Sequence, residues 1–547
     1  MTRRRGGWVL VVFATSSLLF FGGGEHVLSS KVLAVGGPLI KDLDLFSQIL
    51  QRVDTDYVDE VDPHKLMMAS IDGMLGALDP HTQFLDDEQY GDLMVNTQGS
   101  FGGLGIVISV RDGILTVISP MEGTPAYQMG IQGGDRILFI EGESTKGLKS
   151  EAAVKRLRGP KGTKVTISIA REGVEGMTDY TITRDIIELK SVPYAFLLPG
   201  HDSIGYVRVS QFMKTTSADL EAAMTKLERE NIQGLVLDLR RNPGGLLDQA
   251  VAVSELFLEK DELITFTKGR KRASNHKFFD RTEESHEGYP MIVLVNGSSA
   301  SASEIVAGAI QDWDRGLVVG TGTFGKGSVQ SVLPLSEDSG LKITTAKYYT
   351  PSGRSIHKDE KPITVLADPP SDSLPKHPEF RTNAGRTVYG GGGITPDISI
   401  DQERLTKLAD ALERKSLFFD YAVSYVGNHK GPVDEKLRVT DAMLADFEEL
   451  ARSKEIVFAD SEFVADRPYI DCRIRSELLR KRFGDEVAYK TMIEQDDQLA
   501  KAVALFDKAR TLQQMFALAE EERLRNPPAS RDSADAEDSM AGRQPQE

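Results

Sequence analysis

The sequence contains a single cysteine, and this scarcity excludes two common ways of stabilising an exported protein or building a metal site. Cys472 has no partner for an intramolecular disulfide, so a chain of 547 residues must be held by its hydrophobic cores alone. One thiol cannot form a cysteine-rich metal site, and the nine histidines show no HExxH or comparable ligand spacing. The sequence therefore gives no support for a metalloenzyme.

Positive charge is also in deficit. The chain has 65 Lys and Arg residues against 82 Asp and Glu residues, which gives a formal net charge of -17. Nucleic-acid binding needs a concentrated basic surface, so no nucleic-acid partner is expected. Apolar residues make up 40% of the chain, which suits globular packing but is too little for a protein that spans a membrane many times. The length suggests about three or four domains.

A long apolar run occurs at the N-terminus. The basic residues Arg3–Arg5 precede WVLVVFATSSLLFF (Trp8 to Phe21), and three glycines follow. A basic start before roughly 14 mostly apolar residues is typical of a secretory signal or a short uncleaved anchor. No distinct cleavage site follows, so cleavage and retention both stay open. We therefore expect residues 1–38 to direct the protein to the periplasm or cell envelope.

Hydrophobic periodicity divides the first half of the remaining chain. Residues 39–96 place apolar side chains at three- and four-residue steps, from Leu43 to Val53 and from Leu66 to Leu75, and this predicts a helical region. Residues 97–177 change to short strands punctuated by glycine, with an amphipathic helix at Glu151–Gly159. This pattern of short strands, glycine turns and one helix predicts a compact domain of about 80 residues.

The second half of the chain is predicted to alternate between strands and helices and then to become entirely helical. Residues 178–402 contain buried strands such as GLVLDLR (Gly234 to Arg240) separated by helices, which predicts a sheet with helices packed on it. Residues 403–525 are predicted to be helical, and residues 526–547 have the composition of a disordered tail. Eight apolar residues of the helical region can form either a core or a dimer face: Phe418, Phe419, Tyr421, Tyr425, Leu505, Phe506, Met515 and Phe516.

The segment VNGSSASASEIVAGAIQD (Val295 to Asp312) places serines where a buried strand turns into a helix. A serine at such a junction exposes its hydroxyl beside free backbone N–H groups and the positive end of the helix dipole. These conditions stabilise the oxyanion that forms during acyl transfer. The alternative is that Ser298, Ser299, Ser301 and Ser303 are only N-cap and turn residues.

A second segment, VGTGTFGKGSVQ (Val319 to Gln330), places Lys326 between two glycines and between two predicted strands. A lysine is a general base only when uncharged, so its pKa must fall by about 2–3 units from roughly 10.4. Burial that disfavours the charged amine by roughly 3–4 kcal/mol would be sufficient. Gln330, four residues after Lys326, has an amide able to hold the lysine amine. The alternative to a general base is that Lys326 is an ordinary surface lysine in a glycine hairpin. Because no His/Asp pair accompanies the serines, a Ser-Lys pair fits better than a triad.

These segments resemble the carboxyl-terminal processing peptidases, also called tail-specific proteases. SASASE, followed 25 residues after Ser301 by the lysine of TFGKGSVQ, is similar to the active-site motifs of that family. DPHTQFL, GGLGI, IGYVRVSQF, LVLDLRRNPGGLLDQAV, YYTPSGRSI and GGGGITPDI resemble its other motifs in their usual order. The resemblance covers roughly Leu39 to Gln402.

The resemblance implies an α/β multidomain fold. A PDZ domain is inserted before an α/β protease core of the ClpP/crotonase type, and helical regions lie at both ends. It also implies a serine endopeptidase without a metal, nucleotide or other cofactor. Ser301, the middle serine of SASASE, is then the nucleophile, Lys326 is the general base and Gln330 orients the lysine.

The resemblance further assigns the oxyanion hole to two backbone N–H groups. One belongs to Ala302, and the other belongs to Gly244 or Gly245 of the NPGG turn, a choice that stays open. The family often has a charged or larger residue where this chain has Gly297-Ser298. Only the local geometry of that turn is affected by this difference.

The domain at residues 97–177 resembles a PDZ domain, whose GGLGI loop captures a terminal carboxylate while the next strand pairs with the peptide. Arg158 is implied to couple peptide capture to the active site. For the two helix residues, Val154 and Leu157, ordinary core packing is the alternative. The residues implied for peptide binding are Gly103, Leu104, Gly105, Ile106, Val154 and Leu157.

The leading hypothesis is an endopeptidase that recognises the C-terminal ends of exported proteins and cleaves them through an acyl-enzyme. Its partners are protein or peptide C-termini, with a possible membrane anchor and a possible homodimer or adaptor protein. The alternative is a catalytically silent PDZ scaffold in the cell envelope. A β-lactamase-like Ser-x-x-Lys enzyme is excluded, because Ser301 and Lys326 lie on different elements.

Overall fold

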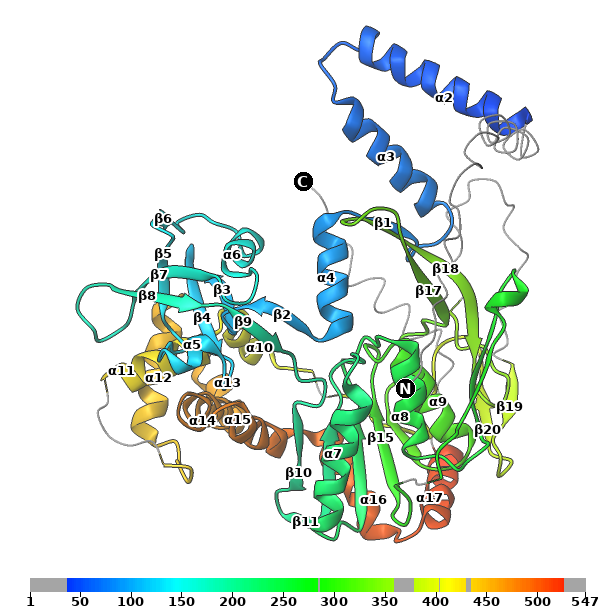
Figure 1. Ribbon diagram of the computed structural model, residues 1–547. Helices are drawn as coiled ribbons and strands as arrows, with labels where there is room; N and C mark the ends of the chain where they lie inside the picture. Colours follow the sequence, from blue (N-terminus) through cyan, green and yellow to red (C-terminus); the bar gives the residue numbers. More distant parts are fainter. Residues whose placement is uncertain (1–36, 284–285, 359–377, 403, 429–433, 526–547) are drawn as a thin grey trace, which may run out of the picture. The chain divides into compact units, whose positions relative to one another are not determined.

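The computed structural model describes residues 37–283, 286–358, 378–402, 404–428 and 434–525 (Figure 1). The expected export segment up to residue 36 and the expected disordered tail lie outside these ranges. Within them, no helix combines the length and the apolar character needed to cross a membrane. The chain forms two compact units, Met1–Phe84 and Leu85–Glu547.

The smaller unit is helical in its described part, which confirms an N-terminal helical region. α2 (Gly37–Asp56) and α3 (Pro63–Gly76) are followed by the short strand β1 (Gln83–Leu85). α3 begins where Asp62 accepts hydrogen bonds from two backbone N–H groups and where proline, which needs no N–H partner, takes the first helical position.

The larger unit starts with α4 (Asp87–Gln98) and a sheet domain. Strands β3, β4, β5, β7 and β8 lie in that order in an antiparallel sheet, β6 pairs with β5, and β2 pairs with β9. Alternate residues of β7 face the core because strand side chains alternate between faces, and they are fully buried. The elements are β2 (Ser100–Gly103), β3 (Ile106–Arg111), β4 (Ile114–Pro120), α5 (Pro125–Gln128), β5 (Arg136–Ile140), β6 (Glu143–Ser144), α6 (Ser150–Leu157), β7 (Lys164–Ala170), β8 (Thr178–Thr183) and β9 (Asp185–Glu188).

An α/β core follows, with strand order β10-β11-β12-β15-β16-β21. All neighbours are parallel except the β10–β11 pair. Alternate residues of β12 face opposite sides, so Leu235 and Leu237 contact the core under α7–α9 while Val236 contacts α16 and α17. The elements are β10 (Tyr194–Leu198), β11 (His201–Arg208), α7 (Thr216–Arg229), β12 (Gly234–Asp238), α8 (Leu247–Glu255), β15 (Met291–Val295), α9 (Ala302–Asp312), β16 (Leu317–Gly320) and β21 (Ile398–Ser399).

A second sheet lies beside this core and carries the loop with the candidate lysine. β17 pairs with β18, β18 with β13, and β13 with β14, while β19 and β20 form a separate hairpin. The bounds are β13 (Leu263–Lys268), η1 (Arg272–Ser274), β14 (Lys277–Phe279), β17 (Ser328–Pro334), β18 (Gly340–Tyr349), β19 (Glu379–Arg381) and β20 (Thr387–Tyr389).

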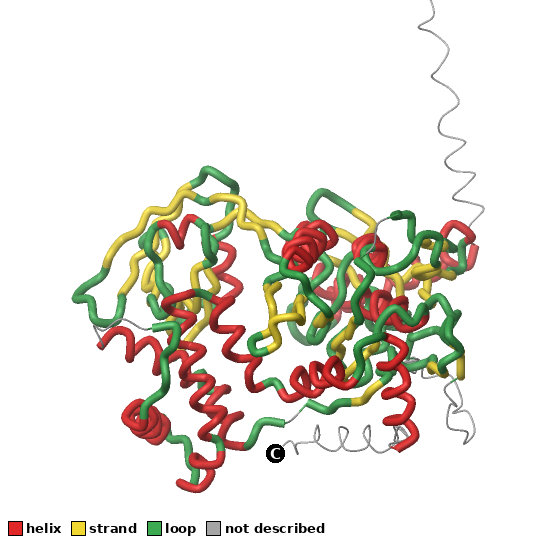
Figure 2. Tube along the Cα trace, turned by 90° about the horizontal axis from the view of Figure 1, so that it is seen from below, coloured by secondary structure: helices red, strands yellow, loops and turns green. Residues whose placement is uncertain are grey.

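From residue 407 onward the described chain is helical, which confirms the predicted C-terminal helical region (Figure 2). α10–α14 enclose a core of their own, whereas α16 and α17 cover one face of the α/β sheet. Of the eight apolar residues that could form a core or a dimer face, four are buried in the cores of this region, Phe418, Tyr421, Phe506 and Met515, and the other four are half-buried. The helices are α10 (Lys407–Arg414), α11 (Leu417–Asn428), α12 (Asp441–Ser453), α13 (Asp460–Ala465), α14 (Arg467–Phe483), α15 (Asp485–Met492), η2 (Ile493–Gln495), α16 (Asp497–Lys508) and α17 (Leu512–Arg525).

Candidate active site

Ser301 lies at the turn between β15 and α9 and has a strained backbone. Its φ of 55° and ψ of -111° fall outside the regions that ordinary L-residues occupy. Such strain persists only where the surrounding structure fixes it, and it gathers at functional sites. The sharp strand-to-helix turn places the serine directly before the first helical residue, Ala302.

The four serines of this turn differ in what their hydroxyls contact. Ser299 and Ser303 are fully buried and donate to main-chain carbonyl oxygens of the 239–242 segment at 2.8 and 2.9 Å. Ser298 is exposed at the tip of the turn. Ser301 is half-buried, and unlike the hydroxyls of Ser299 and Ser303, its hydroxyl does not donate to a carbonyl oxygen of the 239–242 segment. Ser301 is thus the serine that combines a sheltered position with a hydroxyl not engaged by the 239–242 segment.

One buried carboxylate fixes the main chain at both Ser301 and Lys326. Glu304 has no exposed surface, and its Oε2 accepts the N–H of Ser301 at 2.8 Å and the N–H of Lys326 at 3.0 Å. Because both nitrogens lie about 3 Å from one oxygen, they are within about 6 Å of each other. The Oε1 atom accepts from the Thr323 hydroxyl at 2.5 Å and from the Gly325 N–H at 2.7 Å. Burial raises the pKa of Glu304, and these four donors oppose the rise.

Tyr348 joins the same two residues from their carbonyl side. Its hydroxyl donates to the Ser301 carbonyl oxygen at 3.0 Å and to the Lys326 carbonyl oxygen. Burial, followed by the charge of Glu304, raises the pKa of Tyr348 well above its ordinary value, so the hydroxyl keeps the proton that it donates. Ser301 and Lys326 are therefore held at both their N–H and C=O groups by buried side chains.

The side chains of the predicted base and its partner are less tightly arranged. The Gln330 carbonyl oxygen accepts no hydrogen bond from the Lys326 amine or from any other described group. Gln330 donates its amide to Thr344 Oγ1 at 2.7 Å, while its own carbonyl oxygen is buried without a partner in the described chain. That oxygen is an acceptor available to an amine. Lys326 itself is half-buried, at the end of a flexible four-carbon stem.

The NPGG turn lies directly against the serine. A Cβ atom on Gly244 would come within 2.8 Å of the Ser301 Cβ and 2.9 Å of the Ala302 nitrogen. The Gly244 N–H donates to the Asn242 side chain at 2.9 Å, so it is already engaged. The N–H groups of Gly245 and Ala302 make no hydrogen bond within the described chain. Of the two glycines that the sequence left open, Gly245 is the one with an available donor.

The predicted carboxylate-binding loop lies at the start of β3, which forms one edge of its sheet. The N–H groups of Leu104 and Gly105 have no hydrogen-bond partner among the described residues. Gly105 has a φ of 77°, and any Cβ there would come within 2.3 Å of Thr124, so only glycine fits. Gly103 lies in β2, pairs with Asp185 of β9 and is buried, and Ile106 is half-buried at the start of the edge strand.

The three residues implied on and after α6 have different surroundings. Val154 is half-buried on the helix that lies beside β3, while Leu157 is 4% exposed and belongs to the domain core. Core packing therefore accounts for Leu157. The Arg158 guanidinium pairs with Asp92 of α4 at 3.0 Å and covers the Phe101 ring at 4.7 Å. Its contacts are with α4 and β2 rather than with Ser301.

Glu304 and Tyr348 are the site residues that sequence reasoning missed. Glu304 is the last letter of SASASE and lies three residues after the serine, the position from which a glutamate reaches back to the N-cap backbone. This spacing could have predicted the role of Glu304 from the sequence. No sequence pattern could have predicted the role of Tyr348, because that role depends on β18 crossing beside the serine turn.

Two family models match the chain: the PDZ domain over residues 92–170 and peptidase family S41 over residues 203–365. The carboxy-terminal-processing protease of Bartonella bacilliformis is 46% identical over 320 residues, covering 58% of this chain and 73% of the relative. The carboxy-terminal processing protease CtpA of Bacillus subtilis is 31% identical over 439 residues, covering 80% and 91%. Among solved structures, the photosystem II D1 C-terminal processing protease is 28% identical with a TM-score of 0.35, covering 65% of this chain and 92% of that one. The predicted order of a PDZ domain before an α/β protease domain, with helical regions at both ends, is confirmed.

Proposed function

The chain belongs to the carboxy-terminal processing proteases of peptidase family S41, and on this premise we propose that it cleaves proteins by a Ser-Lys acyl-enzyme mechanism after binding their C-terminal ends. It is a serine-type peptidase with a PDZ domain. The observation that carries the proposed mechanism is the shared contact of Ser301 and Lys326 with the buried Glu304 carboxylate.

In the first half-reaction, the Ser301 oxygen attacks the peptide carbonyl carbon while its proton passes to the neutral Lys326 amine. The carbonyl oxygen becomes an oxyanion and accepts the N–H groups of Gly245 and Ala302, which are available for this purpose. Collapse of the tetrahedral species breaks the C–N bond. The lysine ammonium returns its proton to the leaving amine, and an ester on Ser301 remains.

In the second half-reaction, Lys326 takes a proton from water, and the resulting hydroxide attacks the ester. The same oxyanion contacts form, the Ser301–acyl bond breaks, and the proton returns to the serine oxygen. For this chemistry the lysine amine must reach the Ser301 oxygen, which the length of its side chain allows because the two main-chain nitrogens are held within about 6 Å. The unpartnered carbonyl oxygen of Gln330 supports a role in orienting the amine.

The proposed capture of a C-terminus rests on the edge strand of the PDZ domain. Leu104 and Gly105 offer N–H donors for a terminal carboxylate, and β3 offers an unpaired strand edge for the residues before it. Val154 borders this strand on α6 and would contact the last side chain of the peptide.

The test is cleavage of casein by the full chain and its variants. Ser301→Ala and Lys326→Ala should each lower kcat by about 10⁴-fold or more. Lys326→Arg introduces a permanent positive charge that cannot act as a base, so this variant should be equally inactive. Ser298→Ala, in the same turn but exposed, should retain wild-type activity. Persisting cleavage by both alanine variants would refute the mechanism, and a wild-type protein that binds C-terminal peptides without cleaving casein would be a silent scaffold.

Export of the protein is also part of the proposal. Its support is the basic start at Arg3–Arg5 followed by the apolar run from Trp8 to Phe21. The periplasmic or cell-envelope fraction should contain the protein, and substitution of the apolar run with polar residues should leave it in the cytoplasm. Recovery of the wild-type protein in the cytoplasm would contradict this.

Association with a second copy or an adaptor protein is proposed through α2. This helix exposes apolar side chains, among them Leu39, Leu43 and Phe46, each at least 36% accessible. Light scattering of the full chain should give a mass above the 60.1 kDa of one chain, and Leu43→Glu should lower it. A monomeric wild-type chain that also captures no adaptor would overturn this proposal.

A further inference from the structure

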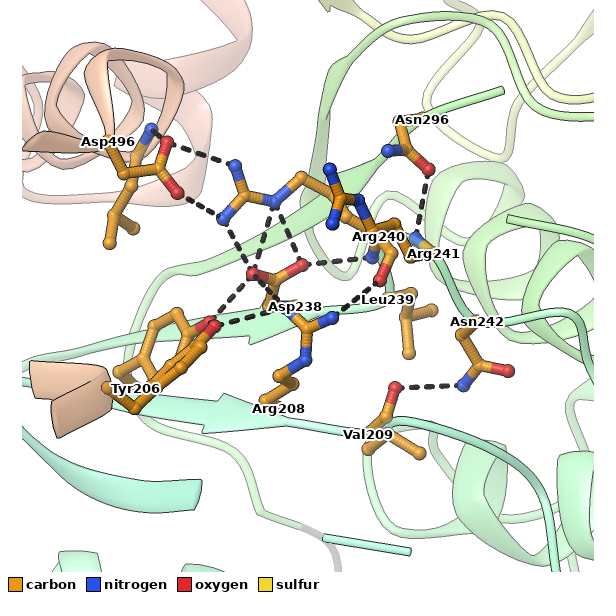
Figure 3. A network of polar contacts seen from close by, with 12 residues as sticks. Tyr206, Arg208, Val209, Asp238, Leu239, Arg240, Arg241, Asn242, Asn296 and Asp496 are labelled. Atoms are coloured by element: carbon orange, nitrogen blue, oxygen red, sulfur yellow. Dashed lines mark hydrogen bonds and ion pairs between the residues drawn. The ribbon is translucent and has the colours of Figure 1, made fainter. Parts of the chain in front are cut away.

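The C-terminal helical region reaches the strand that leads into the oxyanion turn through a buried ionic network (Figure 3). Asp238 ends β12 with no exposed surface, and its carboxylate accepts from the Arg240 side chain at 2.7–3.1 Å and from the Tyr206 hydroxyl at 2.7 Å. Burial acts to raise the pKa of Asp238, but the charges of Arg240 and Arg208 and the hydrogen bonds from Arg240 and Tyr206 together outweigh it, and the pKa lies below its ordinary value. The carboxylate therefore stays ionised and needs its cationic partner.

Arg240 is shared between two carboxylates that are 258 residues apart in sequence. The side of its guanidinium that does not face Asp238 donates to both oxygens of Asp496, at 3.0 and 2.7 Å, and to Gln498 at 3.0 Å. Asp496 also caps α16 by accepting the Leu499 N–H at 2.9 Å. One residue of the C-terminal region thus starts its own helix and holds the arginine.

A second contact comes from α15. The Tyr489 hydroxyl lies 2.7 Å from the Tyr206 hydroxyl and accepts from Arg208 at 3.0 Å, while its ring stacks on Tyr194 at 3.8 Å. Tyr206 and Arg208 both contact Asp238, the first by a hydrogen bond and the second as an ion pair at 3.7 Å.

The NPGG turn (Asn242 to Gly245), here called the oxyanion turn, begins two residues after Arg240. Asn242 is fully buried, accepts the Gly244 N–H on its side chain, and donates from that side chain to the Val209 carbonyl oxygen at 2.9 Å. Its own carbonyl oxygen accepts the Ala300 N–H at 3.0 Å, and so it ties the turn to the segment before Ser301. Arg240 is thus two peptide units from Asn242, which contacts both the Gly244 N–H and the segment before Ser301.

We propose that the C-terminal helical region is a positioning element for catalysis, in which Asp496 holds Arg240 and thereby fixes the turn that presents the Gly245 N–H to the oxyanion. The proposal rests on the Ser-Lys mechanism above and extends it to a region beyond the matched peptidase model, which ends at residue 365. Arg240, Asp496 and Tyr489 touch no reacting atom and act only through the turn.

The testing variant is Asp496→Asn in the full chain. Asparagine caps a helix as well as aspartate does, so α16 keeps its start, while the charge that pairs with Arg240 is removed. Loss of an oxyanion donor lowers kcat by about 10²–10³-fold, and a displaced donor should cost about 10-fold or more. We expect kcat for casein-derived peptides to fall by that factor with KM unchanged.

The affinity for a peptide aldehyde is a measurement that would not change if Asp496 only stabilised the fold. The aldehyde forms a tetrahedral adduct with the serine, so its affinity should fall in Asp496→Asn by the same factor as kcat. The affinity of an uncleaved peptide, measured in the Ser301→Ala background, should not change. Thr440→Ala is the matched control, because Thr440 caps α12, whose buried residues pack in the separate core of α10–α14.

Two results would overturn the proposal: wild-type kcat in a folded Asp496→Asn, or an equal loss in Thr440→Ala. Should Asp496→Asn fail to fold, Tyr489→Phe removes one hydroxyl from the same network and keeps the ring stacked on Tyr194. Unchanged kcat and aldehyde affinity in that variant would then refute the proposal. If Ser301→Ala retains activity, the Ser-Lys mechanism itself is wrong, which is a separate outcome.

Discussion

The buried Glu304 carboxylate makes the sharpest prediction, because it links the two catalytic segments through four hydrogen bonds. In Glu304→Gln one oxygen becomes an NH₂ group, which can only donate. Two of the four donors then lose their acceptor and face another donor. Hydrogen bonds to a charged group contribute about 1.5–3 kcal/mol each, so we expect the free energy of unfolding to fall by about 3–6 kcal/mol.

The assay is urea unfolding followed by the fluorescence of Trp313, which lies at the end of α9, together with kcat on casein. We expect kcat to fall by at least 10²-fold in protein that is still folded, because Ser301 and Lys326 are no longer held by one atom. Asp248→Asn, an exposed carboxylate in the first turn of α8, should change stability by only about 0.3–1 kcal/mol. Wild-type stability and activity in Glu304→Gln would refute the reasoning.

Three further predictions concern the two glycine turns and Lys481 of α14, whose amine donates to the Gly133 carbonyl oxygen of the PDZ domain at 2.8 Å. In Gly245→Ala the new Cβ would lie 2.0 Å from the Phe212 carbonyl oxygen, so the oxyanion turn must shift and kcat should fall about 10²-fold, whereas unchanged kcat would exclude Gly245 as a donor. Gly105→Ala forces the loop away from Thr124 and should weaken C-terminal peptide binding at least 10-fold by calorimetry, while a wild-type affinity would contradict the assigned carboxylate loop. Burial lowers the pKa of Lys481 from 10.5 to about 8, so its destabilising effect is complete below pH 8 and is lost as pH rises to 10.5. The unfolding free energy of the wild type relative to Lys481→Met should therefore increase across that range by up to about 3 kcal/mol, and a flat difference would disprove it.

The sequence was sufficient to predict the two segments that the structure brings together, but not to choose among neighbouring atoms. The strand–serine–helix pattern and the lysine between glycines predicted the two segments, since both depend on local chain geometry. Which serine is available depended on partners about 60 residues away, because the carbonyl oxygens of Leu239 and Asn242 engage Ser299 and Ser303. No local pattern contains that information.

The same reason explains the choice between the two glycines. Gly244 and Gly245 are equivalent in the sequence, and only the Asn242 side chain, folded back onto the Gly244 N–H, distinguishes them. The C-terminal region was ambiguous for a related reason, because a helix periodicity reveals an apolar face but not what covers it. Asp496 looks like an ordinary N-cap until Arg240 is placed beside it.

The most direct test of the central claim is the position of the covalent intermediate. The full chain is mixed with an activated ester of a short peptide, quenched with acid during turnover, digested, and mapped by mass spectrometry. The account predicts the acyl group on Ser301, and its absence in the Ser301→Ala variant. An acyl group on any other residue, or product formation by Ser301→Ala at the wild-type rate, would contradict it.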